Sequence, residues 1–183
     1  GFHGTSHMFV SGEAAKYMGK KPEEVKVITC HLGNGSSIAA VDGGKSVDTS
    51  MGFTPLEGVP MGTRSGNIDP SVIEYLMQKE GWDIARTIKY LNKECGVLGM
   101  SENSSDFRDL MAPGKFDGLN KLAVDAFAYN VKKYVGSYAA VMNGVDVIAF
   151  TAGIGENDST IRAAVLEKFG FLGITLDPVA NDI

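Results

Sequence analysis

Histidine and glycine gather in a loop of this chain that could bind phosphate. The segment from His31 to Ser37 reads His-Leu-Gly-Asn-Gly-Ser-Ser, so that Gly33 and Gly35 permit sharp turns beside a histidine and two hydroxyls. Consecutive backbone N–H groups in such a loop can cradle phosphate oxygens. An isolated Gly-x-Gly is more often a plain tight turn, because short glycine patterns recur by chance. Taken alone, the loop is compatible with both interpretations.

The other two histidines, His3 and His7, stand in the opening segment Gly-Phe-His-Gly-Thr-Ser-His. Histidine can donate a hydrogen bond to a developing phosphoryl charge, transfer a proton or bind a metal. A His-x3-His pair outside a clear helix is a poor zinc signature, since zinc needs further ligands at suitable spacing. The alternative is a histidine hydrogen-bonded to backbone, which we assign to at least one of the three, with His7 the first choice.

Arg64 lies between Gly62 and Gly66 in the run Met-Gly-Thr-Arg-Ser-Gly. Its planar guanidinium can hold an anion through two parallel hydrogen bonds. Arginines are usually exposed on the surface without a special role. The flanking glycines leave space around the side chain, and they favour an anion clamp.

Two further loops are candidates for the edge of a nucleotide site. One covers residues 104–109, and the other covers 153–157 after an apolar run. Ligands of α/β proteins usually bind where strands end, and helix N-termini bind phosphate. Asp106 could instead cap a short helix, and Glu156 with Asn157 could cap the helix that follows. Composition does not decide between these alternatives.

An α/β fold is expected to position these residues. Apolar and β-branched runs predict buried strands over 25–30 and 145–150, and 37–41 with 45–48 predict a β-hairpin around an Asp-Gly-Gly turn. Helices are predicted from Asp69-Pro70, over 83–92, over 119–142 and from about 158 to 168, the last after a glycine turn at 151–157. Because a hairpin is antiparallel, we expect a mixed sheet with helical layers and not a purely parallel one.

Composition narrows the class of protein. With 183 residues, 44% of them hydrophobic and 21% charged, the chain has the proportions of an ordinary globular domain, and no linker divides it. A net charge of −5 without a Lys/Arg block argues against nucleic-acid or anionic-membrane partners. No apolar run in the sequence is long enough to predict a membrane-spanning helix. Cys30 and Cys95 form no metal motif, which favours a reducing cytoplasm. The ends at Gly1 and Ile183 lead us to expect a piece of a longer polypeptide.

Four runs in this order resemble the acetate kinase family, of the acetate and sugar kinase/Hsp70/actin superfamily: GFHGTSH, ITCHLGNGSSIAAVDGGKSVDTSMGFTPLEGVPMGTRSG, SSDFRD and FTAGIGEN. The resemblance covers essentially the whole chain, and the His-x-Gly-x-Gly-x-Ser loop is its most specific part. It implies a ribonuclease H-like (actin-like ATPase) α/β lobe. Residues 1–183 would then form mainly the C-terminal nucleotide-binding lobe, without the N-terminal lobe and the distal C-terminus.

The resemblance also implies a reaction and its residues. The family transfers a phosphoryl group between ATP and acetate, giving ADP and acetyl phosphate with Mg²⁺, largely by positioning and charge stabilisation. His3 and His31 would contact the phosphoryl group, and Arg64 the substrate anion. The remaining implied residues are Asn34 and Gly35 along the ATP phosphates, Asp106, Phe107, Arg108, Gly153, Ile154 and Asn157 around the adenosine, and Phe2 and Pro55 at the acetyl methyl group.

The family pattern is incomplete in this chain. Its N-terminal lobe supplies an asparagine, a second arginine and a magnesium-linked aspartate, and its distal C-terminus supplies a metal-linked glutamate. We therefore expect no metal ligand here, weak nucleotide binding, a homodimer and no appreciable turnover. Two alternatives remain: a propionate or butyrate kinase of the same superfamily, or a non-catalytic nucleotide-binding lobe like those of actin and Hsp70. The histidines and Arg64 favour phosphoryl chemistry over binding alone.

Overall fold

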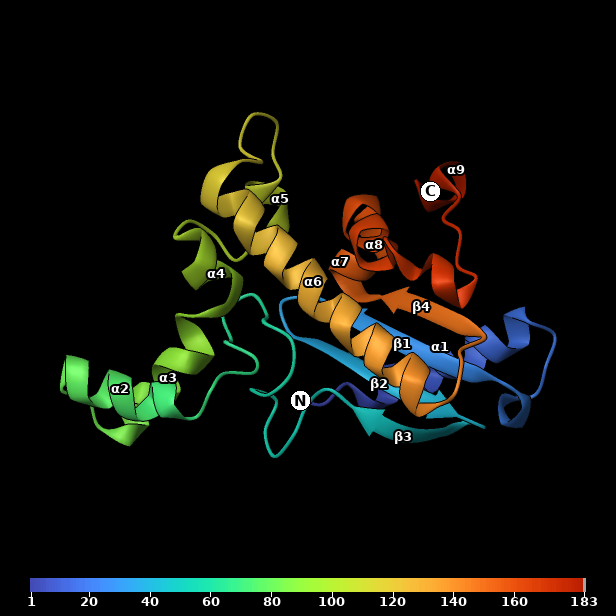
Figure 1. The fold of residues 1–183 in the computed structure, drawn as a ribbon, viewed down its shortest axis with the longest axis horizontal. Helices are drawn as coiled ribbons and strands as arrows, with labels where there is room; N and C mark the ends of the chain where they lie inside the picture. The colour runs from blue at the N-terminus through green and yellow to red at the C-terminus, as the bar shows by residue number, and fades with distance from the viewer. Residues whose placement is uncertain (183) are drawn as a thin grey trace.

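The computed structural model describes residues 1–182, which fold around one four-stranded sheet (Figure 1). The strands are β1 (Lys26–Leu32), β2 (Ser36–Asp42), β3 (Lys45–Thr49) and β4 (Val147–Thr151), in the spatial order β3-β2-β1-β4. β2 pairs antiparallel with both β1 and β3, whereas β1 and β4 are parallel. The predicted mixed sheet and its hairpin are confirmed.

Helices cover both faces of this sheet, and further helices extend from it (Figure 1). In chain order they are α1 (Gly4–Tyr17), α2 (Ser71–Glu80), α3 (Ile84–Lys93), α4 (Gly96–Ser101), α5 (Phe107–Leu110), α6 (Gly118–Val141), α7 (Ala152–Asn157), α8 (Ser159–Leu166) and α9 (Pro178–Asn181), with short 3-10 turns η1 (Pro22–Glu24) and η2 (Phe169–Leu172). The predicted helices over 83–92 and 119–142 are confirmed as α3 and α6. No helix within residues 1–182 is long and apolar enough to cross a membrane.

The two faces of the sheet have different partners. Side chains alternate along a strand, so Ile28, Cys30 and Leu32 all point into the main core, where they pack with α6 and α8. The opposite face of β1 carries Thr29 and His31 and lies under α1. Figure 1 shows α6 crossing the near face of the sheet and α1 behind it. The layer between β1 and α1 is therefore polar toward the end of β1, whereas Val27 and Ala15 form an apolar cluster at its other end.

Two segments differ from the sequence-based expectation. Residues 4–17 form α1, although no helix was predicted there, and the expected glycine turn at 151–157 is the short helix α7. The Glu156 carboxylate accepts hydrogen bonds from Ala152 N and Thr151 Oγ1, both at 2.9 Å, and so closes the first turn of α7. The suggestion that Glu156 and Asn157 cap the next helix was wrong, because Asp158 caps α8 by accepting from Ile161 N at 2.9 Å.

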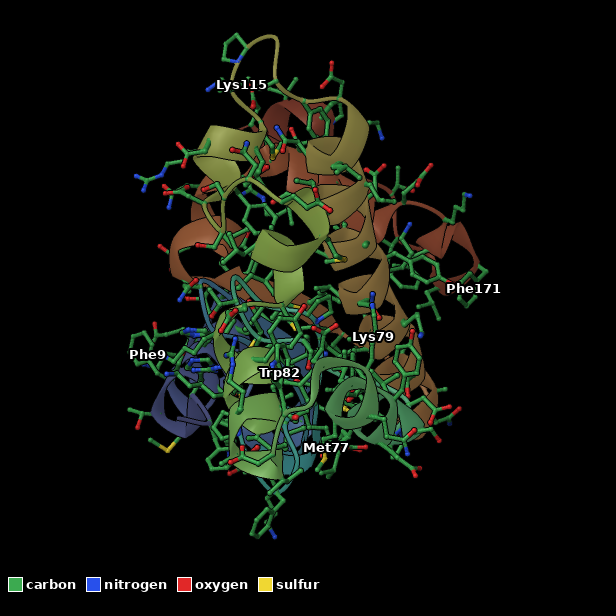
Figure 2. All side chains as sticks on the ribbon, turned by 90° about the vertical axis from the view of Figure 1, so that its left-hand side faces the viewer. Phe9, Met77, Lys79, Trp82, Lys115 and Phe171 are labelled. Atoms are coloured by element: carbon green, nitrogen blue, oxygen red, sulfur yellow. The ribbon has the colours of Figure 1, made fainter. Side chains whose placement is uncertain are left out.

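Helices α2 and α3 contact each other and project away from the sheet (Figure 1). The predicted start near Asp69 is slightly early, since Pro70 occupies the N-cap position and Asp69 Oδ1 accepts from Ser71 N at 2.9 Å. The predicted apolar face of α2 contains no fully buried residue. In Figure 2 this pair faces the viewer around Trp82, whose ring centroid lies 4.5 Å from the Arg86 guanidinium.

Candidate functional site

The loop between β1 and β2 is a tight, internally bonded turn. Gly33 N donates to Gly35 O at 3.2 Å, and the Ser36 hydroxyl donates to Gly33 O at 2.9 Å. Because β1 and β4 run parallel, the carboxyl ends of both strands reach the same edge of the sheet as this loop. The three predicted features of the sequence, the His31 loop, the histidine pair and the 153–157 segment, meet at this edge.

The three histidines form one cluster. His3 is the residue before α1 and has a left-handed backbone (φ 57°), and its ring stacks on that of His31 with centroids 3.8 Å apart. His7 lies one helical turn further along α1, and its ring centroid is 6.4 Å from that of His3 and 6.3 Å from that of His31. The His-x3-His pair thus spans the start of a helix, with His3 at the N-cap position and His7 within α1, and β1 supplies the third histidine.

Hydroxyl groups hold each imidazole ring in place. Ser6 Oγ and His31 Nδ1 lie 2.9 Å apart, and Ser37 Oγ lies 2.8 Å from His3 Nδ1. His7 is buried and is hydrogen-bonded through both ring nitrogens to Thr29 and Ser37. The expectation that His7 is a satisfied histidine is correct, but its partners are side-chain hydroxyls and not backbone groups.

The cluster is held in the neutral state. Burial lowers the pKa of His3 to about 4, with smaller effects from the charges of His31, the amino terminus and Arg64. Burial likewise lowers the pKa of His7 to about 4, with the neighbouring histidines adding to it. The pKa of His31 is also lowered by burial, against the opposing effect of Glu156. At neutral pH the rings therefore act as hydrogen-bonding groups without charge.

Arg64 lies beside the histidine cluster. Its Nη1 donates to Pro55 O at 3.3 Å and contacts Met61 Sδ at 3.4 Å. A β-carbon added to Gly35 would lie 3.5 Å from both Arg64 Nη1 and His3 Nε2. Gly35 therefore fits between a guanidinium and an imidazole, which together present N–H donors around the loop backbone. Such a set suits an oxyanion.

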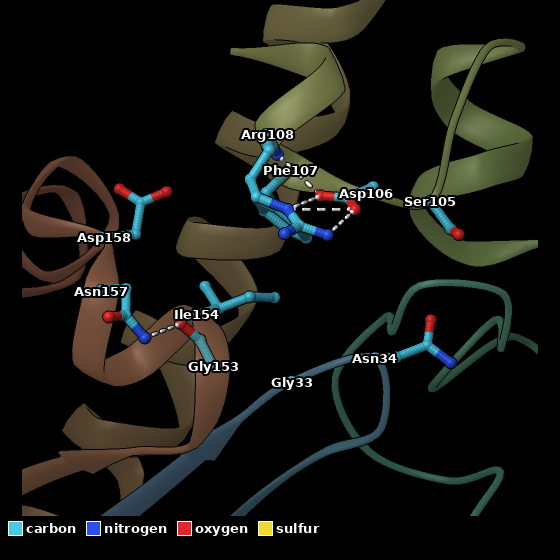
Figure 3. Close-up of a pocket in the computed structure, with 10 residues that line it drawn as sticks. All are labelled: Gly33, Asn34, Ser105, Asp106, Phe107, Arg108, Gly153, Ile154, Asn157 and Asp158. Atoms are coloured by element: carbon cyan, nitrogen blue, oxygen red, sulfur yellow. Dashed lines mark hydrogen bonds and ion pairs between the residues drawn. The ribbon is translucent and has the colours of Figure 1, made fainter. Parts of the chain in front are cut away.

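A cavity of about 750 Å³ opens on the other side of the loop (Figure 3), within the usual size range of small-molecule sites. Every predicted nucleotide-binding residue except Gly35 lines it. The lining residues are Gly33, Asn34, Ser105, Asp106, Phe107, Arg108, Gly153, Ile154, Asn157 and Asp158. Gly33, Ser105 and Asp158 line the cavity without having been predicted as binding residues, although each is adjacent in sequence to a predicted one.

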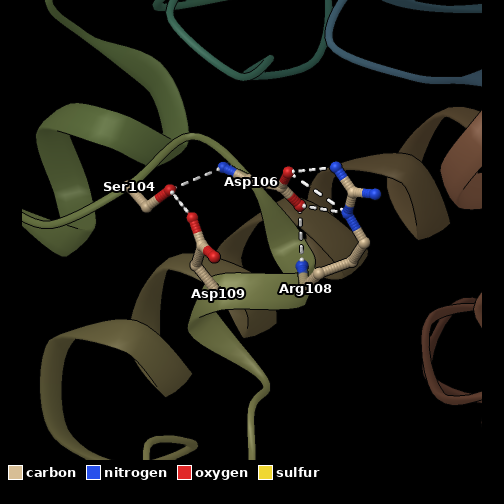
Figure 4. A network of polar contacts seen from close by, with 4 residues as sticks. All are labelled: Ser104, Asp106, Arg108 and Asp109. Atoms are coloured by element: carbon tan, nitrogen blue, oxygen red, sulfur yellow. Dashed lines mark hydrogen bonds and ion pairs between the residues drawn. The ribbon is translucent and has the colours of Figure 1, made fainter.

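Asp106 and Arg108 form a local polar network at the cavity wall (Figure 4). Arg108 Nη2 donates to Asp106 Oδ2 at 2.6 Å and Arg108 N donates to Asp106 Oδ1 at 2.9 Å, so the carboxylate both pairs with the guanidinium and caps α5. These hydrogen bonds lower the pKa of Asp106 to about 2. Phe107 between them is buried, and its ring packs 4.9 Å from that of Phe127 in α6. Asp106 is therefore both a helix cap and a cavity residue.

Phe2 and Pro55 lie outside this cavity. The Phe2 side chain is half exposed, and Pro55 contacts the site through its carbonyl, which accepts from Arg64. Their expected role at an acetyl methyl group stays a prediction. Within residues 1–182 no group of three or more His, Cys, Asp and Glu side chains could hold a metal ion. We therefore assign no step to a metal ion.

The sheet order, the polar strand edge and the cavity define an actin-like α/β lobe with a nucleotide-sized site. The chain belongs to the acetokinase family, whose model matches residues 1–183. It is 58% identical to the acetate kinase of Staphylococcus haemolyticus and 59% identical to that of Acetivibrio thermocellus, in each case over 100% of this chain and 46% of the relative. The chain therefore spans about half the length of the curated relatives that it matches.

Solved structures give the same family. The crystal structure of Porphyromonas gingivalis acetate kinase matches with a TM-score of 0.94 and 47% identity, over 100% of this chain and 46% of that one. A propionate kinase from Francisella tularensis matches with a TM-score of 0.92 and 45% identity, over 100% and 47%. The predicted family and its actin-like fold are confirmed.

Proposed function

We propose that this chain is the nucleotide-handling part of a kinase that transfers a phosphoryl group between ATP and acetate. One observation carries the proposal: Asn34 lines the cavity, and the next residue, Gly35, lies against His3 and Arg64. A nucleotide whose base occupies the cavity can therefore extend its phosphates along the loop toward the histidine and arginine donors. Identity of 57–59% to acetate kinases supports acetate as the acceptor.

Positioning and charge stabilisation are what this arrangement supplies to phosphoryl transfer. Asp106, Arg108 and Asn157 would orient the nucleoside, and the backbone N–H groups of Asn34 and Gly35 would face the phosphates, since Gly33 N–H is bonded within the turn. Arg64 would supply positive charge, and the neutral rings of His3 and His31 would donate hydrogen bonds to the phosphoryl oxygens.

The remaining parts of the proposal rest on the family. We propose that the chain forms the C-terminal lobe of a longer enzyme, a cytoplasmic homodimer, with Phe2 and Pro55 near the methyl group of acetate. Propionate is the second candidate acceptor, because a propionate kinase matches this fold at a TM-score of 0.92. One extra methylene changes affinity by only about 1–3 kcal/mol, so a comparison of the two acids in the longer enzyme distinguishes the candidates.

Calorimetric titration of ADP with Mg²⁺ into this chain tests the nucleotide site. We expect weak binding that an Asp106→Ala/Arg108→Ala double variant abolishes. The matched control is Arg86→Ala/Glu94→Ala, which removes another exposed ion pair, at 2.5 Å, whose two residues do not line the cavity. The control is expected to bind like the wild type. Binding that persists in the first variant would refute the assignment.

An assay for acetyl phosphate formation tests the second part of the proposal. We expect no appreciable turnover by this chain alone, because it covers only 46% of the acetate kinases that it matches. Turnover at the rate of a full-length acetate kinase would contradict this expectation and would mean that the chain carries a complete active site.

A further inference from the structure

Four side chains form a continuous hydrogen-bonded row beneath α1. Thr29 Oγ1 lies 2.6 Å from His7 Nδ1, His7 Nε2 lies 2.7 Å from Ser37 Oγ, and Ser37 Oγ lies 2.8 Å from His3 Nδ1. Thr29 and Ser37 are fully buried on neighbouring strands, and His7 is nearly so. The row begins in the interior at Thr29 and ends at His3, whose Nε2 faces Gly35 and Arg64.

The hydrogens in this row can be arranged in two directions. Ser37 has one hydroxyl hydrogen, so when both histidines are neutral it donates to one ring and accepts from the other. In the first direction Thr29 donates to His7 Nδ1, His7 Nε2–H donates to Ser37, and Ser37 donates to His3 Nδ1. In the second direction every hydrogen bond is reversed, and Thr29 becomes the acceptor at the end of the row.

Thr29 decides between the two directions. Its hydroxyl makes no other hydrogen bond within residues 1–182 and is fully buried. In the second direction the hydroxyl hydrogen of Thr29 would be buried without an acceptor, and an unsatisfied buried donor is unfavourable. In the first direction every hydrogen of the row has an acceptor, and the last hydrogen is left on His3 Nε2.

We propose that Thr29 is a positioning residue that acts through His7 and Ser37 to fix His3 in the Nε2–H tautomer. His3 then presents a neutral donor next to the Arg64 guanidinium, on the side of the ring that faces Gly35. The opposite tautomer would place a lone pair there, which repels a phosphoryl oxygen. The tautomer itself follows from the resting structure, whereas its use in phosphoryl transfer rests on the proposed function.

Nitrogen NMR of the histidine rings tests this directly, because a protonated and a bare ring nitrogen have very different ¹⁵N shifts. The chain contains only three histidines, so long-range ¹H–¹⁵N spectra of the labelled protein at pH 7.5 resolve them, with His31→Gln and His7→Gln variants for assignment. We expect His3 and His7 both to be Nε2–H, with at least about a tenfold excess over the other tautomer.

Thr29→Val supplies the second test, since it removes the hydroxyl with little change of shape, and that hydroxyl is bonded to His7 and not to His3. Both directions then leave one His7 nitrogen unpaired, so the tautomer ratio of His3 is expected to fall to about one, and Thr29→Ser is expected to restore it. Thr87→Val is the matched control, because Thr87 is also fully buried and its hydroxyl donates to Asp83 O at 2.9 Å, outside the cluster.

Two results would overturn the proposal: an Nδ1–H tautomer of His3 in the wild type, or a His3 ratio that Thr29→Val leaves unchanged. The wild-type spectrum decides by itself if Thr29→Val does not fold. Either result would leave the kinase proposal standing. Conversely, absence of phosphoryl transfer in the longer enzyme would refute the proposed function and leave the tautomer assignment intact.

Discussion

Replacing Gly96 by alanine is expected to destabilise the loop that carries Arg64. Gly96 has φ 62°, and an added β-carbon would lie 2.1 Å from Met61 O and 2.5 Å from Arg64 O. These carbonyls accept hydrogen bonds from Val97 N at 2.8 Å and Met61 N at 3.0 Å. The left-handed backbone costs alanine about 1–2 kcal/mol, and loss of both hydrogen bonds adds about 1 kcal/mol each. The free energy of unfolding should fall by about 3–4 kcal/mol.

Gly81→Ala separates the two contributions. Gly81 ends α2 with φ 67°, but nothing lies within 4 Å of its added β-carbon, so this variant carries only the backbone strain. Urea unfolding followed by circular dichroism should show Gly96→Ala less stable than Gly81→Ala by about 2 kcal/mol. At a slope of about 2 kcal/mol/M this is a midpoint difference of about 1 M. Equal midpoints would refute the claim that the two carbonyls determine the effect.

The low histidine pKa values predict that stability falls in acid. In the unfolded state His3 and His7 take up protons near pH 6.5, whereas in the folded state their pKa values are about 4, so the unfolding free energy should decrease as the pH falls from 6.5 to about 4. Urea unfolding midpoints measured across this range should depend less on pH in His7→Gln than in the wild type. An equal pH dependence in the two proteins would contradict this prediction. Burial raises the thiol pKa of the fully buried Cys30 and of the less buried Cys95. A thiol reagent should label only Cys95 in the native chain, and labelling that persists in Cys95→Ser would refute this.

Strands were easier to predict than the helices around the site. The runs 25–30 and 145–150 are β-branched and apolar because β1 and β4 lie between two helical layers. Such continuous apolar runs can be recognised in the sequence. The helix α1 was missed because its polar face is buried: His7 and Ser11 point inward while Phe9 and Tyr17 are exposed, which removes the usual amphipathic signal. Burial of polar groups cannot be read from periodicity.

The helix α7 was missed for a different reason. Gly153 and Gly155 made residues 151–157 resemble a turn, but the helix depends on a glutamate that bonds to the start of its own first turn. The lining of the cavity was predicted more fully, since the motifs around Asn34 and Asp106 carried the family resemblance. The contacts among Thr29, Ser37 and the histidines could not be predicted, because they join positions up to 34 residues apart through side chains alone.

The site beside Gly35 combines a neutral donor, the imidazole of His3, with a charged donor, the guanidinium of Arg64. A histidine with a pKa near 6.5 would gain charge within the physiological range, so the attraction of an anion would vary with pH. With the pKa of His3 near 4 the ring stays neutral, so the positive charge beside Gly35 comes from the guanidinium of Arg64. The donor set facing Gly35 is therefore constant around neutral pH. Burial of the imidazoles against α1 is what provides this constancy, and the hydroxyls of Thr29 and Ser37 make that burial possible by satisfying the ring nitrogens.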